Sequence, residues 1–340
     1  MRIAKDFNNP TTAIADRKET RNKMAQEICD SDLKEKYFFR VPYAHYLADY
    51  IWPGFMISPQ RLIHLKDMHF NEDDVIVASY PKSGTTWVSE IVSAILFNAD
   101  MEALSKERLD ERVPWLELDL QFVWAKFFFI WKNIFEGTAL RLPKRSPRVF
   151  FSHLPIELLP RDVIAGKCKI IYVIRNPKDN AVSYFHFHRM ARFLGQQKTT
   201  WDEFLSLYMA GQLYCGSWFE HVISYERLAR TINDRVLVVQ YEQMMKDLDK
   251  EIQRISQFLG RSLTENQRKL VQEHCSFGAM KRNHKTNRHG VWLFNQKVSE
   301  FMRKGQVGDW KNYFSVAQKE AFDELFKAKM AHCSFRFICD

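Results

Sequence analysis

Short apolar runs alternate with amphipathic segments over most of the chain. Four runs, at residues 75–79, 148–151, 169–174 and 235–240, are rich in Val, Ile and Phe and have the length of buried strands. Helical patterns follow the first and third runs, and residues 242–259 continue the last run as one long helical pattern. This alternation predicts an α/β fold, a single domain with a central mostly parallel sheet flanked by helices.

The N-terminal part of the chain differs from the rest. Residues 1–35 are polar and charged, and they contain no apolar run of signal-peptide length. We expect an N-terminal extension at 1–35, mobile or peripheral, and one domain at 36–340. The most apolar stretch, residues 122–131, contains Lys126 and is too short to span a bilayer, which predicts no stable membrane insertion.

Composition narrows the function only a little. The 340 residues are 46% hydrophobic, enough for a substantial core, and the formal net charge is +9. This charge attracts nucleic acid, acidic membranes and phosphorylated cofactors alike. The six cysteines form no CxxC pair and no metal-ligand spacing, so we expect no metal site, no disulfide framework and a cytoplasmic location.

A candidate phosphate-binding loop follows the first predicted strand. Residues 80–87 read Tyr-Pro-Lys-Ser-Gly-Thr-Thr-Trp and lead into a helix. Gly84 lets the backbone turn closely around an anion, Lys82 adds charge, and Thr85 and Thr86 add hydroxyl donors. The alternative is an ordinary strand-to-helix turn. Because the lysine precedes the only glycine, the loop is not a Walker A motif, which disfavours a magnesium-dependent kinase or ATPase.

Two further motifs follow in order. Residues 175–183 read Arg-Asn-Pro-Lys-Asp-Asn-Ala-Val-Ser, and residues 301–310 read Phe-Met-Arg-Lys-Gly-Gln-Val-Gly-Asp-Trp. Together with the loop at 80–87 they resemble the cytosolic sulfotransferase family, over about residues 45–335. The resemblance implies an enzyme that transfers a sulfuryl group from 3′-phosphoadenosine 5′-phosphosulfate (PAPS) to a hydroxyl of a small apolar acceptor. The products would be a sulfate ester and 3′,5′-ADP (PAP).

The resemblance also implies a nucleotide site. Residues 80–87 would hold the 5′-phosphosulfate, the arginines and Ser183 the 3′-phosphate, and the aromatic rings the adenine. From the residues alone Arg175 is the most telling, because a free charge at the end of a buried strand is costly, whereas the aromatic side chains could equally belong to the core. The implied residues are Lys82, Ser83, Gly84, Thr85, Thr86, Trp87, Arg175, Ser183, Tyr241, Cys275, Ser276, Phe277, Phe301, Met302, Arg303, Lys304 and Gly305.

The implied catalytic pair is His153 and Lys82. A histidine suits the role of general base because its ordinary pKa lies near operating pH, and Lys82 would neutralise charge on the leaving phosphate. Phe151 stands where many family members have a lysine. Either the enzyme works with one cation fewer, or the chain binds PAPS and PAP but turns over poorly.

The acceptor and the partners are less defined. Trp115 and Phe187 match positions that line the family's acceptor pocket beside His153, and the aromatic segment 118–147 could form a lid or belong to the core. Phenols, sterols, retinoid-like and other alcohols are all compatible. Residues 311–320 resemble the family's dimer-forming stretch, which implies a homodimer, although Ser315 could simply be a helix N-cap. No recognisable module supports binding of nucleic acid.

Overall fold

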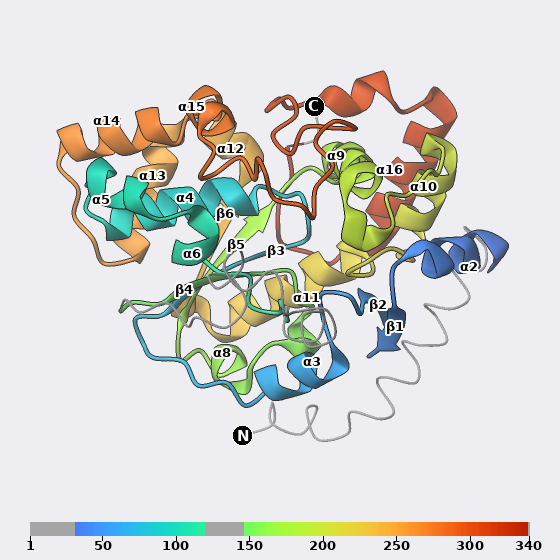
Figure 1. Ribbon diagram of the computed structural model, residues 1–340, viewed down its shortest axis with the longest axis horizontal. Coiled ribbons are helices and arrows are strands. Elements are labelled where there is room, and N and C mark those ends of the chain that lie inside the picture. Colours follow the sequence, from blue (N-terminus) through green and yellow to red (C-terminus); the bar gives the residue numbers. More distant parts are fainter. Residues whose placement is uncertain (1–30, 120–145, 339–340) are drawn as a thin grey trace, which may run out of the picture.

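The computed structural model describes residues 31–119 and 146–338, and its centre is a four-stranded parallel sheet (Figure 1). The strand order is β4-β3-β5-β6, with the bounds β3 Val75–Ser79, β4 Val149–Ser152, β5 Lys169–Ile174 and β6 Val236–Gln240. Two strands have the predicted bounds, β4 is shifted by one residue at both ends, and β6 begins one residue later than predicted. The predicted α/β fold is confirmed.

Helices follow the strands as expected, with one correction. α4 (Thr85–Leu96) follows β3 and α9 (Pro177–Met190) follows β5. The prediction of one helix over 242–259 is wrong, because the segment forms α12 (Tyr241–Lys246) and α13 (Leu248–Phe258). Asp247 separates them with non-helical backbone angles, φ −151° and ψ 85°, and its side chain accepts a hydrogen bond from the Lys250 N–H as the N-cap of α13.

The sheet is buried on both faces. Ile76 and Ala78 pack in a cluster with residues of α9 and of α11 (Trp218–Thr231), whereas Val75 and Val77 pack with residues of α4 and α13. Because successive side chains of a strand point to opposite faces, helices on both sides explain why β3 is apolar throughout. The carboxyl ends of the strands are therefore the open edge at which a ligand can bind.

The remaining elements surround this core. α2 runs across residue 35, and the buried Tyr37 within it contacts His188 Nε2 at 3.0 Å through its hydroxyl. The antiparallel strands β1 and β2 follow it. The bounds are α2 Ser31–Arg40, β1 Ala44–Leu47, β2 Tyr50–Pro53, α3 Pro59–Leu65, α5 Met101–Lys106, α6 Leu109–Arg112, α8 Arg161–Ile164, α10 Trp201–Met209, α14 Glu265–His274, α15 Phe277–Arg282 and α16 Val316–Met330.

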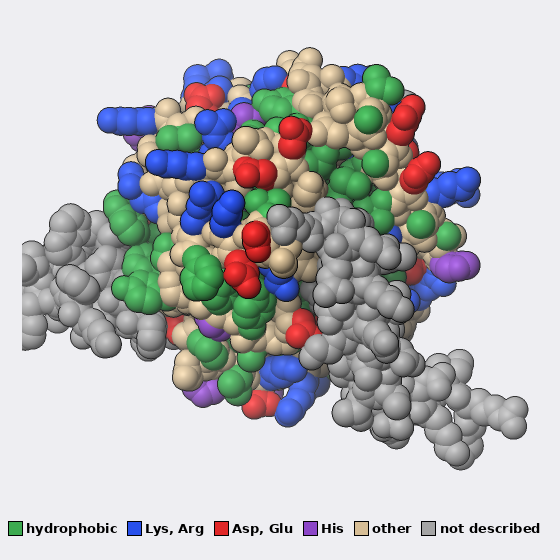
Figure 2. Space-filling view, turned by 90° about the vertical axis from the view of Figure 1, so that its right-hand side faces the viewer, with side chains coloured by type: hydrophobic (Ala, Val, Ile, Leu, Met, Phe, Trp, Pro, Cys, Tyr) green, Lys and Arg blue, Asp and Glu red, His purple; other side chains and the backbone are tan. Residues whose placement is uncertain are grey.

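Two predictions concern segments at the periphery. Ser315 is the N-cap of α16, within a capping box that includes Gln318, and the homodimer through 311–320 stays a prediction. The lid predicted for 118–147 falls almost wholly on residues 120–145, which lie outside the described residues. Of the helices in the described ranges, none has both the length and the apolar character needed to cross a membrane. On the face shown in Figure 2, basic and acidic side chains are interspersed.

Candidate active site

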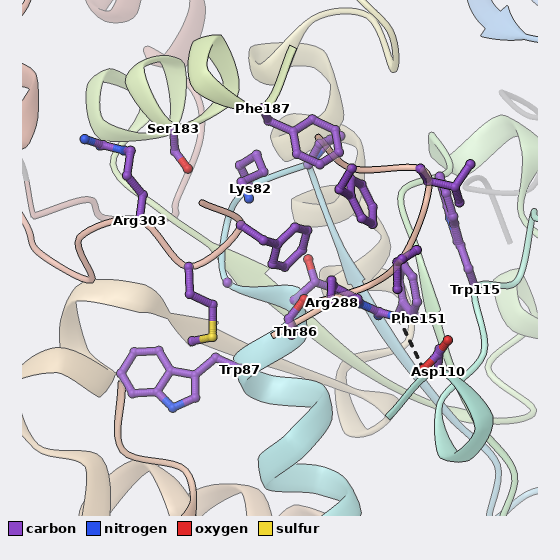
Figure 3. A pocket seen from close by; sticks show the side chains of 18 of the residues that line it. Lys82, Thr86, Trp87, Asp110, Trp115, Phe151, Ser183, Phe187, Arg288 and Arg303 are labelled. Atoms are coloured by element: carbon purple, nitrogen blue, oxygen red, sulfur yellow. Dashed lines mark ion pairs between the residues drawn. The ribbon is translucent and has the colours of Figure 1, made fainter. Parts of the chain in front are cut away.

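A cavity of about 650 Å³ opens at the carboxyl ends of β3, β4 and β5. The cavity is lined by the loop after β3, the end of β4, residues after β5 and two stretches between α15 and α16. Trp87, Ser183 and Arg303 lie at one end of the view in Figure 3, with Lys82 between them and the pair Trp115 and Phe151. The cavity therefore has a basic end and an aromatic end.

The loop after β3 has the geometry of an anion cradle. Lys82 and Gly84 both have positive φ, 68° and 113°, and Gly84 is the N-cap of α4 without a side-chain hydrogen bond. A Cβ at Gly84 would meet the Tyr241 ring at 2.9 Å. The first N–H groups of a helix have no partners within it, and the positive end of its dipole favours an anion. The turn that the sequence predicted is therefore built so that the backbone can approach a ligand closely.

Lys82 lies among aromatic rings rather than carboxylates. Its Nζ is 4.2 Å from the ring centroid of Phe301 and 4.9 Å from that of Phe187. Burial, together with the positive charges of Arg175 and Arg303, lowers the pKa of Lys82 to about 7. An anion bound at the loop would therefore be stabilised by Lys82 and would in turn favour its charged form.

Arg175 has the geometry of an anion ligand. It is only 8% exposed, its Nη1 donates to the Lys82 carbonyl at 3.1 Å, and its guanidinium carbon is 4.3 Å from the Tyr241 ring centroid. Its buried Nε has no hydrogen-bond partner among the described residues. A buried donor without a partner is costly, so a bound phosphate would satisfy it.

Further basic groups come from the segment before α16. Arg303 and Lys304 both pair with Asp309, at 2.6 and 2.5 Å, and line the same cavity as Arg175 and Ser183. Asp309 neutralises part of their charge and fixes the two side chains in place. The structure thus brings together basic groups that lie far apart in the sequence.

His153 follows β4 and is held from two sides. Its Nδ1 lies 2.8 Å from the Ser79 carbonyl oxygen and donates to it, which leaves Nε2 with the lone pair. Its backbone N–H donates to Glu117 Oε1 at 2.7 Å. Burial lowers the pKa of His153 to about 4, so the imidazole is neutral at pH 7 and can accept a proton.

Glu117 is a site residue that sequence reasoning missed. It is fully buried, and burial raises the pKa of its carboxyl group to about 7. Its sequence position near Trp115 gave no hint of the contact, because residues 117 and 153 meet only through the fold. The carboxyl group fixes the backbone of the candidate base.

The aromatic end lies beside His153. The rings of Trp115 and Phe151 stack at 5.7 Å with 16° between their planes, and the Phe151 centroid is 5.7 Å from that of His153. The predicted pocket residue Phe187 lies 5.9 Å from Phe193. Lining residues that the sequence did not single out include Phe55, Leu118, Phe193, Tyr214, Arg288, Trp292 and Phe294.

Most of the implied nucleotide residues line the cavity, but three do not. Ser83 is buried and accepts a hydrogen bond from Asn180, the Cys275 carbonyl accepts one from Trp87 Nε1 at 2.7 Å, and Ser276 is the N-cap of α15. Each of these three residues makes a structural hydrogen bond instead of lining the cavity. The implied residues that line the cavity are Lys82, Gly84, Thr85, Thr86, Trp87, Arg175, Ser183, Tyr241, Phe277, Phe301, Met302, Arg303, Lys304 and Gly305, together with His153, Trp115 and Phe187.

The chain is similar to known proteins over most of its length. Residues 72–334 match the model of the sulfotransferase domain. Sulfotransferase 1A1 of Bos taurus is 38% identical over 304 residues, which cover 89% of this chain and 95% of the relative. Sulfotransferase 1C2 of Rattus norvegicus is 40% identical over 272 residues, which cover 79% and 86%.

Solved structures are similar over nearly the same length. A retinol dehydratase in a complex with retinol and PAP matches with a TM-score of 0.74 and 26% identity, over 90% of this chain and 96% of the other. The mouse sulfotransferase SULT7A1 complexed with PAP matches with a TM-score of 0.64 and 31% identity, over 86% and 96%.

Proposed function

The chain belongs to the sulfotransferase family, and on that premise we propose that it transfers the sulfuryl group of PAPS to a hydroxyl of a small, mostly apolar acceptor. One observation carries the proposal. A single cavity holds a basic anion cradle at one end, a neutral histidine in the middle and stacked aromatic rings at the other end. Such a cavity suits a polyanionic donor and an apolar acceptor that meet at the histidine.

The basic end is proposed to hold the nucleotide. PAP occupies three of the similar solved structures, and the residues here have the chemistry that PAP requires. The α4 N-terminus, Lys82 and Thr86 would bind the 5′-phosphosulfate. Arg175 and Ser183 would bind the 3′-phosphate together with Arg303 and Lys304, since a planar guanidinium matches a phosphate with paired hydrogen bonds. Trp87 and Phe277 would enclose the adenine.

The proposed reaction places a distinct task on each side chain. His153 Nε2 takes the proton of the acceptor hydroxyl, whose oxygen then forms a bond to sulfur. The bond between sulfur and the 5′-phosphate oxygen breaks, and its electron pair stays on that oxygen. Lys82 neutralises the charge that develops there. The sulfate ester and PAP leave.

The aromatic end is proposed to hold a flat apolar alcohol. Two of the similar solved structures, both of retinol dehydratase, are complexes with retinol and with androsterone, which are apolar alcohols. Trp115 and Phe187 would contact such a molecule, and Phe151 adds a ring where a charged side chain would be unfavourable for it.

We further propose a cytoplasmic homodimer that uses residues 311–320.

The first test is transfer from radiolabelled PAPS to a panel of phenols, sterols and apolar alcohols. We expect label in the sulfate ester of at least one acceptor class, separated from PAPS by chromatography. The alternative, a protein that binds PAPS and PAP but turns over poorly, is favoured by Phe151. That alternative predicts PAP binding without transfer, together with a gain of transfer in Phe151→Lys, and this result would contradict the proposed function.

A glycine substitution tests the nucleotide end. Gly305 has φ +62°, and a Cβ there would meet the Phe277 ring at 2.3 Å. Gly305→Ala should weaken PAP binding by about tenfold or more, because an overpacked contact costs about 1–3 kcal/mol. The matched control is Gly260→Ala, since Gly260 has φ +69° and nothing within 4 Å of the added atom. Equal PAP affinities for the two variants by calorimetry would contradict the assignment of Phe277.

A further inference from the structure

The loop after α15 carries an arginine into the cavity. Arg288 has φ 59°, a left-handed conformation that is uncommon for a residue with a side chain. The loop around it is fixed by hydrogen bonds: the buried Thr286 hydroxyl donates to the Met280 carbonyl, and the Leu109 N–H donates to the Lys285 carbonyl. Left-handed backbone persists only where its surroundings enforce it, and such positions gather at functional sites.

The Arg288 guanidinium is nearly buried and weakly paired. Its side chain is 12% exposed. Among the described residues its one ion pair is with Asp110, at 3.8 Å between Nη1 and Oδ1, which is longer than a hydrogen bond. Asp110 is also shared with Arg108, whose Nε lies 3.2 Å away. A guanidinium that lines a cavity with its donors this poorly satisfied is available to an anion.

The position of Arg288 indicates which anion. Its guanidinium carbon is 5.8 Å from the centroid of the Phe151 ring, and the His153 ring is 5.7 Å from the same centroid. Figure 3 draws Arg288 beside Phe151, with the dashed line to Asp110. Arg288 and His153 therefore both lie close to the Phe151 ring, on the aromatic side of the cavity. In the proposed reaction the acceptor hydroxyl meets the sulfuryl group beside His153, so the sulfuryl oxygens are the anionic atoms that come near Arg288.

We propose that Arg288 is a further catalytic residue, which donates hydrogen bonds to the oxygens of the sulfuryl group during its transfer. This inference rests on the proposed function. The bond between sulfur and the phosphate oxygen breaks with its electron pair on phosphate, the acceptor oxygen bonds to sulfur, and His153 takes the acceptor proton. Arg288 neither gains nor loses a proton in this step. It stabilises the sulfuryl oxygens opposite Lys82, which acts on the leaving oxygen.

The test compares Arg288→Gln with Arg192→Gln. Arg192 is a matched control, because its guanidinium carbon is also 5.8 Å from an aromatic centroid, that of Trp292, and it does not line the cavity. With PAPS and a productive acceptor, Arg288→Gln should lower kcat by about 10²–10³-fold, as for the loss of one preorganised donor. Arg192→Gln should leave kcat nearly unchanged. PAP affinity, which should be kept in both variants, verifies folding.

Two more measurements distinguish a catalytic role of Arg288 from a structural or acceptor-binding role. In the Arg288→Gln background, Phe151→Lys should restore part of kcat, because it returns a cation to the same space. Arg288→Gln should also weaken PAPS binding while leaving PAP binding unchanged, since PAP lacks the sulfuryl group. An unchanged kcat, a loss confined to the acceptor KM, or equal weakening of PAPS and PAP would overturn the proposal. If the wild-type chain transferred nothing, the proposed function would fail, and the PAPS and PAP affinities would still decide the role of Arg288.

Discussion

His153→Ala is expected to lower kcat by about 10²–10⁴-fold, the usual contribution of a positioned general base. The hydrogen bond from Nδ1 to the Ser79 carbonyl leaves Nε2 as the only ring nitrogen that can accept the acceptor proton. Binding of PAP should persist, because the basic groups at the other end of the cavity are unchanged. Sulfuryl transfer at saturating PAPS and acceptor measures the effect.

The matched control for this variant is His186→Ala. Burial lowers the pKa of His186 to about 4, as it does for His153, but His186 contacts the Tyr313 hydroxyl and does not line the cavity. Its removal should leave kcat almost intact. A His153→Ala enzyme with normal kcat would exclude the histidine as the base, and a similar loss in both variants would point to damage to the fold.

Lys82→Met is expected to lower kcat by about 10²–10³-fold and to change the pH dependence. The proposed base, His153, works when neutral, so activity should be lost as the pH falls through about 4. Lys82 works when charged, and its pKa in the free protein is about 7, so kcat/KM for PAPS should fall as the pH rises through about 7. In Lys82→Met this alkaline limb should disappear, and its persistence would assign the limb to another group.

Lys304→Met is the matched control for Lys82→Met, because it removes one lysine from the same end of the cavity. The Lys304 side chain is 42% exposed and pairs with Asp309, and in the proposed function it binds the 3′-phosphate rather than the reacting group. We expect a higher KM for PAPS with kcat nearly unchanged. If Lys304→Met lowered kcat as strongly as Lys82→Met, the two lysines would not have separate tasks.

The sequence predicted those parts of the site that are local in the chain. The strand, the glycine and the helix start at residues 75–96 form one continuous unit, so the anion cradle could be inferred from spacing alone. Arg175 could be inferred for the same reason, as the residue that follows β5. Both inferences depend on the rule that ligands bind at the carboxyl ends of parallel strands.

What the sequence did not predict depends on contacts between distant segments. Glu117 acquires its role only because the fold places it 2.7 Å from the His153 N–H, and Arg288 only because a loop after α15 returns to Phe151. Neither Glu117 nor Arg288 belongs to a motif that can be recognised in the sequence. The break at Asp247 was missed for another reason: a capping side chain competed with a continuous apolar period, and the cap prevailed.

The segment between α15 and α16 lines both ends of the cavity, with residues 288–294 near the aromatic rings and residues 301–306 among the basic groups. If nucleotide binding orders this segment, it meets part of the entropic cost of ordering the same segment for the acceptor, and the two ligands are then energetically coupled. Such coupling is reciprocal, and the acceptor must change the affinity for nucleotide by the same factor. Acceptor affinities measured without nucleotide therefore describe a different state of the protein from the one that turns over.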